Sequence, residues 1–177
     1  MPWTGVGARA TPIKIQRIMT EFASLKKNAC RTGGAEGADE AFMKGARKQE
    51  VYLPNQGFRG HTGIWDYTEK QLEFADFILT FAFPGHIKKF TTRAMFRRNV
   101  FQVLGLCDSE AGAKPSKFLL CWTPDGATSR DEYELGVTGG TGIAINIASM
   151  FDVPVYNLQR KDHRREILDY IADRKSA

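Results

Sequence analysis

Short apolar runs of strand length alternate with helical patterns along most of this chain, and this alternation restricts the fold more than any other feature. The apolar runs lie at residues 3–6, 29–32, 51–53, 118–122 and 153–157. Chains that alternate in this way form α/β domains, because each helix connects two parallel strands and covers one face of the sheet. We therefore predict an α/β fold with an open, mostly parallel sheet.

The helical patterns between these runs are amphipathic. The first follows an N-cap and first-turn pair, Thr11 and Pro12, and has apolar residues spaced three and four apart: Ile15, Ile18, Met19 and Phe22. The second, at residues 35–42, has a face of small residues that lets a helix lie close to the strands. A last helix is predicted at residues 162–174.

One domain accounts for the length of the chain, which has 177 residues, 42% of them hydrophobic and 25% charged. The segment at residues 55–90 fits the alternation least, because glycines interleave with aromatic residues there. We predict a helix at residues 66–75 within it. We interpret the rest of this segment as an insertion or lid within the single domain 1–177. The alternative is an ordinary surface loop.

Cysteine usage and the apolar runs bear on the compartment. Cys30, Cys107 and Cys121 are odd in number, far apart and without a C-x-x-C spacing, which is typical of reduced thiols in a cytosolic protein. The first residues do not resemble a secretory signal, and the longest apolar run, at residues 77–83, is too short to cross a bilayer. We expect a cytoplasmic protein that does not contact a membrane.

Three glycine-rich turns are candidate phosphate-binding loops, because glycine lets backbone N–H groups approach a phosphate and the following helix dipole stabilises its charge. The residues in these turns that we expect to bind phosphate are Gly7 and Arg9; Gly33, Gly34, Ala35 and Gly37; and Gly139, Gly140, Thr141 and Gly142. The alternative for each turn is that glycine only permits tight geometry. None of them is a Walker A loop or a complete G-x-G-x-x-G, which argues against an ATPase and an ordinary dinucleotide dehydrogenase.

The positive charge of the chain is concentrated near one predicted helix. Residues 77–107 contain no acidic residue and five lysines and arginines, which equals the net charge of +5 of the whole chain. A helix at residues 90–104 has an apolar arc defined by Phe90, Phe96, Val100, Phe101, Val103 and Leu104. Arg93 and Arg97 fall inside this arc, whereas Arg98 and Asn99 lie off it. The two arginines either extend past the core edge to solvent or reach over the glycine turns to hold a phosphate, with Arg98 and Asn99 at the rim of the same pocket.

Acid–base groups are available, but metal and nucleophile motifs are not. Glu36, Asp39, Glu40 and Asp125 lie near the expected pocket and are candidates for a ribose contact or a base, with helix-terminal or turn roles as the alternative. The histidines and cysteines lack metal-ligand spacing, and no serine lies in a G-x-S-x-G. We expect no metal and no cofactor.

Together the segments TGVGAR, RTGGAEGADEAF, RRNVFQVLG, LLCWTPDG and GGTGIAINIASMFDVPVYNL resemble the Smf/DprA and LOG (SLOG) superfamily, in particular its small stand-alone members common in bacteriophages. The resemblance covers residues 3–158 and implies a Rossmann-like sheet with helices on both faces. The superfamily includes phosphoribohydrolases, proteins that bind single-stranded DNA, and sensors of nucleotide-derived signals. It also implies self-association, and for a phage protein the host cytoplasm.

One departure from the hydrolase branch affects the expected activity. That branch has a Met-x-x-Arg-Lys helix, and Met95, Arg97 or Arg98, and Asn99 resemble this motif. It also has a glycine turn followed by a catalytic Glu. In this chain Asn146 occupies the position of that Glu. An amide cannot act as the acid or base that a carboxylate supplies. We therefore expect binding rather than turnover.

The resulting hypothesis is a protein that binds a nucleotide or nucleotide-derived signal through the glycine turns and Arg93, Arg97 or Arg98, with sequestration of a host defence signal as its purpose. Trp122 and Asp125 are candidates for base or ribose contacts. One alternative is a nucleoside-monophosphate N-glycosidic hydrolase that uses Glu36 or Asp39. The other is a DprA-like mediator that binds single-stranded DNA, favoured by the pI of about 9.2.

Overall fold

The computed structural model describes residues Met1 to Ala177 and confirms the α/β fold. Five parallel strands form one sheet in the order β3-β2-β1-β4-β5, so that β1 is the central strand and pairs with β2 and β4. The strands are β1 (Trp3–Gly5), β2 (Cys30–Thr32), β3 (Gln49–Val51), β4 (Leu119–Cys121) and β5 (Val155–Asn157). The sheet is thus of the open, Rossmann-like kind.

Six α-helices surround the sheet: α1 (Ile13–Leu25), α2 (Ala38–Gly45), α3 (Glu69–Ala82), α4 (Phe90–Leu104), α5 (Thr141–Met150) and α6 (Lys161–Ser176). Two short 3-10 helices lie at Phe58–Gly60 and Arg130–Glu132. The predicted helix at 90–104 is confirmed, whereas α3 begins later and extends further than the predicted 66–75. Thr68 explains where α3 begins, because it forms a capping box with Gln71.

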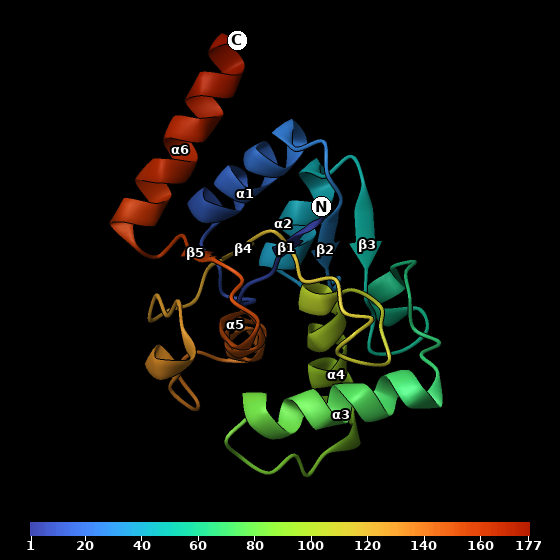
Figure 1. Ribbon diagram of the computed structural model, residues 1–177. Helices are drawn as coiled ribbons and strands as arrows, with labels where there is room; N and C mark the ends of the chain where they lie inside the picture. The colour runs from blue at the N-terminus through green and yellow to red at the C-terminus, as the bar shows by residue number, and fades with distance from the viewer.

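The helices pack on the two faces of the sheet in two sets of three (Figure 1). One core cluster joins residues of α1, α2 and α6, and the other joins residues of α3, α4 and α5. Successive side chains of β4 alternate between them, since Leu119 and Cys121 belong to the second cluster and Leu120 to the first. A sheet buried on both faces explains why its strands read as continuous apolar runs.

The environment of α4 changes along its length, and this corrects the predicted apolar arc. All residues from Arg98 to Leu104 are buried, whereas Phe90, which the arc placed in the core, is 79% exposed. The C-terminal half of the helix is surrounded by the sheet and by its neighbours, so that polar residues on every side of it become buried. A single arc calculated for the whole helix could not represent both halves.

The order of the strands creates a switch point between β1 and β4. From β1 the chain winds outward to β2 and β3, and then returns to place β4 and β5 on the other side of β1. In open parallel sheets, the crevice outside the carboxyl ends of the strands at such a point is where ligands bind. The turns that follow β1 and β4 are therefore where a site is expected.

None of the six helices combines the length and the apolar character needed to span a membrane. All three cysteines are buried and none is bonded to another. Burial raises the pKa of each thiol, most directly that of Cys30 and Cys121, which have no exposed surface.

Candidate functional site

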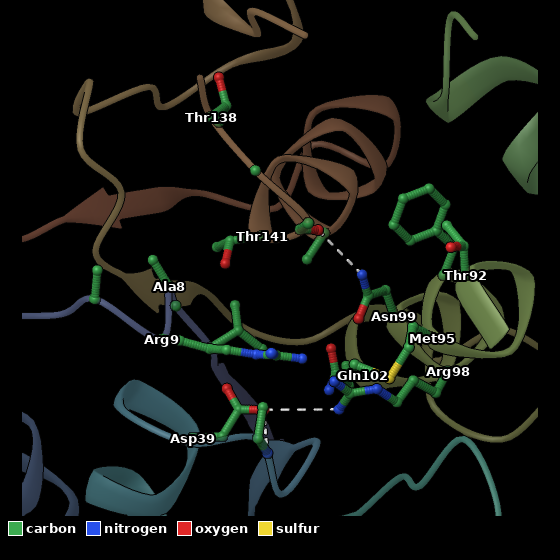
Figure 2. A pocket seen from close by; sticks show the side chains of 18 residues that line it. Ala8, Arg9, Asp39, Thr92, Met95, Arg98, Asn99, Gln102, Thr138 and Thr141 are labelled. Carbon is green, nitrogen blue, oxygen red and sulfur yellow. Dashed lines mark hydrogen bonds and ion pairs between the residues drawn. The ribbon is translucent and has the colours of Figure 1, made fainter. Parts of the chain in front are cut away.

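A cavity of about 520 Å³ lies at the switch point. Its walls come from the turn after β1, from one side of α4, from the start of α5, and from the start of α2 (Figure 2). Arg9, Asp39 and Arg98 are the only charged residues among its lining. Two cations against one carboxylate make the cavity suited to an anion.

The turn after β1, residues 7–10, forms the first wall. Gly7 is required there, because a Cβ at this position would lie 2.5 Å from the Cβ of Ala38 at the start of α2. The backbone N–H groups of Arg9 and Ala10 have no acceptor in the chain. The Arg9 side chain is exposed and forms no ion pair, and Figure 2 shows it extending into the cavity towards Arg98 and Asp39.

The start of α5 forms the second wall. The N–H groups of Gly140 and Thr141 have no acceptor in the chain, as is usual for the first residues of a helix without a side-chain cap. Free N–H groups and the positive end of the helix dipole form an anion-binding arrangement. Thr138 precedes this turn and donates a 2.6 Å hydrogen bond to Asp125, which holds the turn in place.

The buried half of α4 contributes the third wall through Arg98, Asn99 and Gln102. The groups around the Gln102 amide fix its orientation. Its oxygen accepts hydrogen bonds of 3.0 Å from Arg98 and from the N–H of Gly33, and its nitrogen donates to Asn99 at 3.0 Å. Asn99 in turn donates to the carbonyl of Gly140 at 3.2 Å. This chain of hydrogen bonds connects the turn before α2 with the start of α5.

Arg98 is a buried cation with few partners. The residue is 4% exposed, its Nη1 lies 3.6 Å from Asp39 Oδ2 and 3.5 Å from the carbonyl of Tyr52, and its Nε has no partner. Both distances exceed that of a good N–H···O bond, so the acceptor from Gln102 is its only close one. A guanidinium has five donors. Arg98 therefore retains capacity for an anion in the cavity.

Asp39 is the counter-charge of Arg98 and is 3% exposed. Burial raises the pKa of its carboxyl, and Arg98 and the N–H of Ala35, which donates at 3.2 Å, oppose that rise. Burial lowers the pKa of Arg98, and the charge of Arg9 adds to this effect. Arginine nevertheless stays protonated, since its ordinary pKa is above 12.

The segment between β3 and α3 contacts both Arg98 and α2. The Phe58 ring lies 5.8 Å from the guanidinium carbon of Arg98. Arg59 and His61 attach this segment to α2 through Glu40, at 3.0 and 3.4 Å. We predicted an insertion or lid at residues 55–90, and part of that segment, Phe58–Gly60, lies over Arg98.

The cavity brings together many of the residues that the sequence singled out. The predicted binding residues that line the cavity are Gly7, Arg9, Ala35, Asp39, Arg98, Asn99, Gly139, Gly140 and Thr141. Those that do not line it are Gly33, Gly34, Gly37, Gly142, Arg93, Arg97, Glu36, Trp122 and Asp125. Glycines of the turn before α2 thus lie behind the wall rather than on it.

Arg93 and Arg97 take a different direction from the one predicted. Arg97 forms a bidentate ion pair with Asp76 of α3 at 2.6 and 2.7 Å, and Arg93 lies 3.4 Å from the same carboxylate. Hydrogen bonds from Arg97 lower the pKa of Asp76, and burial opposes this effect. The two arginines therefore join α4 to α3, and we leave them out of the site.

The remaining predicted residues have structural partners. Glu36 is largely exposed and lies 4.0 Å from Arg59. Trp122 is buried in the core beside α1 and α6 and donates to Gln159, and Asp125 accepts from Thr123 and Thr138. Asn146 is buried behind the cavity and donates to the carbonyl of Ala82 at 2.7 Å.

Sequence reasoning did not include several residues of the cavity in the site, among them Thr92, Met95, Phe96, Gln102, Thr138 and Ala144, although Met95 was matched to the helix motif of the hydrolase branch. Four of them lie on α4, at the spacing of one helix face: residues 92, 95, 96 and 102. That spacing could have identified the face once Arg98 and Asn99 were taken as its centre. Met95 and Phe96 give this side of the cavity an apolar surface.

Comparison of the chain with family models, with curated proteins and with solved structures gave no match. No group of three or more His, Cys, Asp or Glu side chains is arranged to hold a metal ion. The assignment of a function therefore depends on the cavity itself.

Proposed function

We propose that this protein binds a nucleotide or another small molecule that carries a phosphate, in the cavity between the turn after β1 and the start of α5. One observation carries the proposal: the buried Arg98 lines a cavity whose other walls include backbone N–H groups without an acceptor, and its counter-charge, Asp39, lies 3.6 Å from it. An anion in the cavity would accept charge-assisted hydrogen bonds from the guanidinium and further bonds from these N–H groups.

The distribution of polar and apolar surface supports a nucleotide over a simple anion. Arg9, Gly140 and Thr141 form the polar end, where a phosphate accepts from N–H groups. Met95 and Phe96 form an apolar surface of the kind on which a base or another flat ring packs. Membership of the SLOG superfamily, a phage origin and self-association belong to the same proposal and follow from the sequence resemblance. A cytoplasmic location is proposed as well and follows from the cysteine usage.

We propose binding rather than turnover. Asn146 is turned towards the end of α3 and is absent from the cavity lining, so it contributes no acid or base there. Asp39 is the only carboxyl in the lining, and it is engaged with Arg98 and Ala35. Sequestration of a nucleotide-derived signal is the purpose that fits this arrangement.

The test is mass spectrometry of small molecules released from natively purified protein, and calorimetric titration with a panel of nucleotides that includes cyclic and NAD-derived species. Arg98→Gln should weaken binding of the retained nucleotide by at least about tenfold, because a charge-assisted hydrogen bond to phosphate is lost. Arg97→Gln is the matched control on the same helix, and its affinity should stay that of the wild type. Equal losses in both variants would contradict the proposal.

A second candidate function is supported by Asp39, whose raised pKa would suit a proton donor in N-glycosidic hydrolysis. It predicts free base and ribose phosphate after incubation with nucleoside monophosphates, and loss of that product in Asp39→Asn. Recovery of only intact nucleotide excludes it. Binding of single-stranded DNA that weakens steeply with salt, together with no retained nucleotide, would instead favour the DNA-binding alternative.

A further inference from the structure

We infer that an anion bound in this cavity competes with Asp39 for Arg98, and that binding is therefore coupled to uptake of a proton by Asp39. The inference rests on the proposed function, since it concerns the same cavity. It adds a regulation that the binding proposal does not contain: affinity that depends on pH through one buried carboxyl.

The first step of the argument is that the pair between Asp39 and Arg98 is loose. Their closest atoms are 3.6 Å apart, which is too far for a hydrogen bond, and the N–H of Ala35 donates to Asp39 at 3.2 Å. Arg98 has an unused Nε besides. A ligand oxygen that reaches the guanidinium therefore does not have to break a strong bond to Asp39.

The second step concerns the charges around Asp39 before and after an anion binds. Arg98 faces it from α4, Arg9 extends towards it from the turn after β1, and the buried thiol of Cys30 on β2 is close enough for the carboxylate to raise the pKa of that thiol. Arg98 is thus the principal cation that opposes the rise in the pKa of Asp39, in a site where burial favours the neutral carboxyl.

The third step is the effect of the ligand. An anion at Arg98 takes over part of the guanidinium charge and places a second negative charge beside a carboxyl that is already buried. Two negative charges that share one buried site do not both persist, so one of them takes up a proton. Asp39 is the group that does so, and its new O–H can donate a hydrogen bond to the ligand.

The sign of the pH dependence follows from this. Binding raises the pKa of Asp39, so the complex holds one proton more than the free protein between the two pKa values. Affinity is highest below the pKa of the free protein, falls by up to tenfold per pH unit through that window, and is constant above it.

Sulfate is the probe, because it mimics phosphate and does not titrate near neutral pH. The protein is titrated calorimetrically with sodium sulfate between about pH 5 and 8, in pairs of phosphate-free buffers that differ in ionisation enthalpy. The difference in heat between the two buffers gives the number of protons taken up. We expect a value that rises towards one proton per site within this range. No uptake at any pH, or no sulfate binding at all, would overturn the inference.

Variants separate this coupling from a purely structural role. Asp39→Asn keeps the acceptor for Ala35 but cannot be charged, so it should abolish proton uptake and bind sulfate more tightly than the wild type at pH 8. A structural role for Asp39 predicts weaker binding instead. Glu36→Gln makes the same change of charge outside the cavity and should leave the uptake unchanged.

The two proposals fail in different ways. If a cyclic mononucleotide binds without proton uptake, the competition between ligand and Asp39 is refuted and the binding function stands. If sulfate binds with proton uptake and no nucleotide binds, the binding function is refuted, whereas the coupling remains a property of the anion site.

Discussion

The turn before α2 and the turn before α5 are both rich in glycine and both precede a helix, yet they differ in what occupies the space beside them. A methyl group on Gly33 would overlap the guanidinium of Arg98 and the amide of Gln102. A methyl group on Gly140 would meet no atom closer than 3.9 Å. The first turn is closed by the protein's own side chains, and the second is open to the cavity.

This difference shows that one sequence pattern serves two purposes. In the closed turn, the N–H of Gly33 is satisfied by Gln102, and glycine is needed so that an arginine can pack against the backbone. In the open turn, the N–H groups of Gly140 and Thr141 remain free. Only the open turn has the unused donors that a phosphate requires, although the closed turn positions Arg98 for the same ligand.

The largest effect is expected from adding a methyl group to each turn. Gly33→Ala should lower the free energy of unfolding by about 2 to 3 kcal/mol, because the packed Arg98 and Gln102 must move. Gly140→Ala should change it by less than about 0.5 kcal/mol, since the site is open and its backbone is helical. Urea denaturation followed by circular dichroism measures both.

The ligand affinity of the second variant completes this test. The new methyl group of Gly140→Ala would project towards the cavity and should weaken nucleotide binding by about tenfold, as measured by calorimetry. If Gly33→Ala were as stable as the wild type, the distinction between a closed and an open turn would be wrong.

A smaller effect is expected from removing the amide that closes the first turn. Gln102→Leu leaves the N–H of Gly33 and one donor of Arg98 buried without an acceptor, which should cost about 2 kcal/mol of unfolding free energy. Thr141→Ala in the open turn removes a hydroxyl that makes no hydrogen bond within the chain, and thermal unfolding should detect almost no change. Equal stability of the two variants would contradict the role assigned to Gln102.

The smallest effect is expected at the ion pair between Glu40 and Arg59, which attaches the segment around Phe58 to α2. A hydrogen bond from Arg59 lowers the pKa of Glu40 below its ordinary value. A depressed carboxyl pKa contributes stability above the unfolded-state value, near 4.3, and that contribution is lost as the pH falls through the folded-state pKa. Glu40→Gln should therefore cost less than about 0.5 kcal/mol at pH 7, because Glu40 is 39% exposed and solvent screens the pair.

Comparison of wild type and Glu40→Gln by urea denaturation at pH 7 and at about pH 3 checks the direction, because the difference should shrink in acid. A difference that grows in acid would mean that another group holds the segment around Phe58 in place.

Most of the fold could be predicted from sequence, because local pattern determines it. All five strands lie at or beside the predicted apolar runs, and α4 has the predicted bounds. The direction of Arg93 and Arg97 could not be predicted in this way. Their partner, Asp76, lies on another helix, and only the packing of α3 across α4 brings it within 3.4 Å of both.

The candidate site was predictable in part for the same reason. Gly7, Gly139 and Gly140 were identified because backbone geometry selects glycine at tight turns, after a strand in the case of Gly7 and before a helix in the case of Gly139 and Gly140. Gln102 was not, because nothing local distinguishes it from any other glutamine on a helix. Its role depends on Gly33 and Arg98, which reach it from a different turn and from the preceding helical turn.

The position of β1 in the sheet has a consequence for how the protein is made. β1 pairs with β2, which follows it closely, and with β4, which begins at Leu119. Ribosomes add about 5 to 20 residues per second, so β1 has one unpaired edge for roughly ten seconds of synthesis. The wall that includes Thr141 is completed later still. A ligand can therefore stabilise only the finished chain. During synthesis, the partly formed sheet has to persist without that stabilisation.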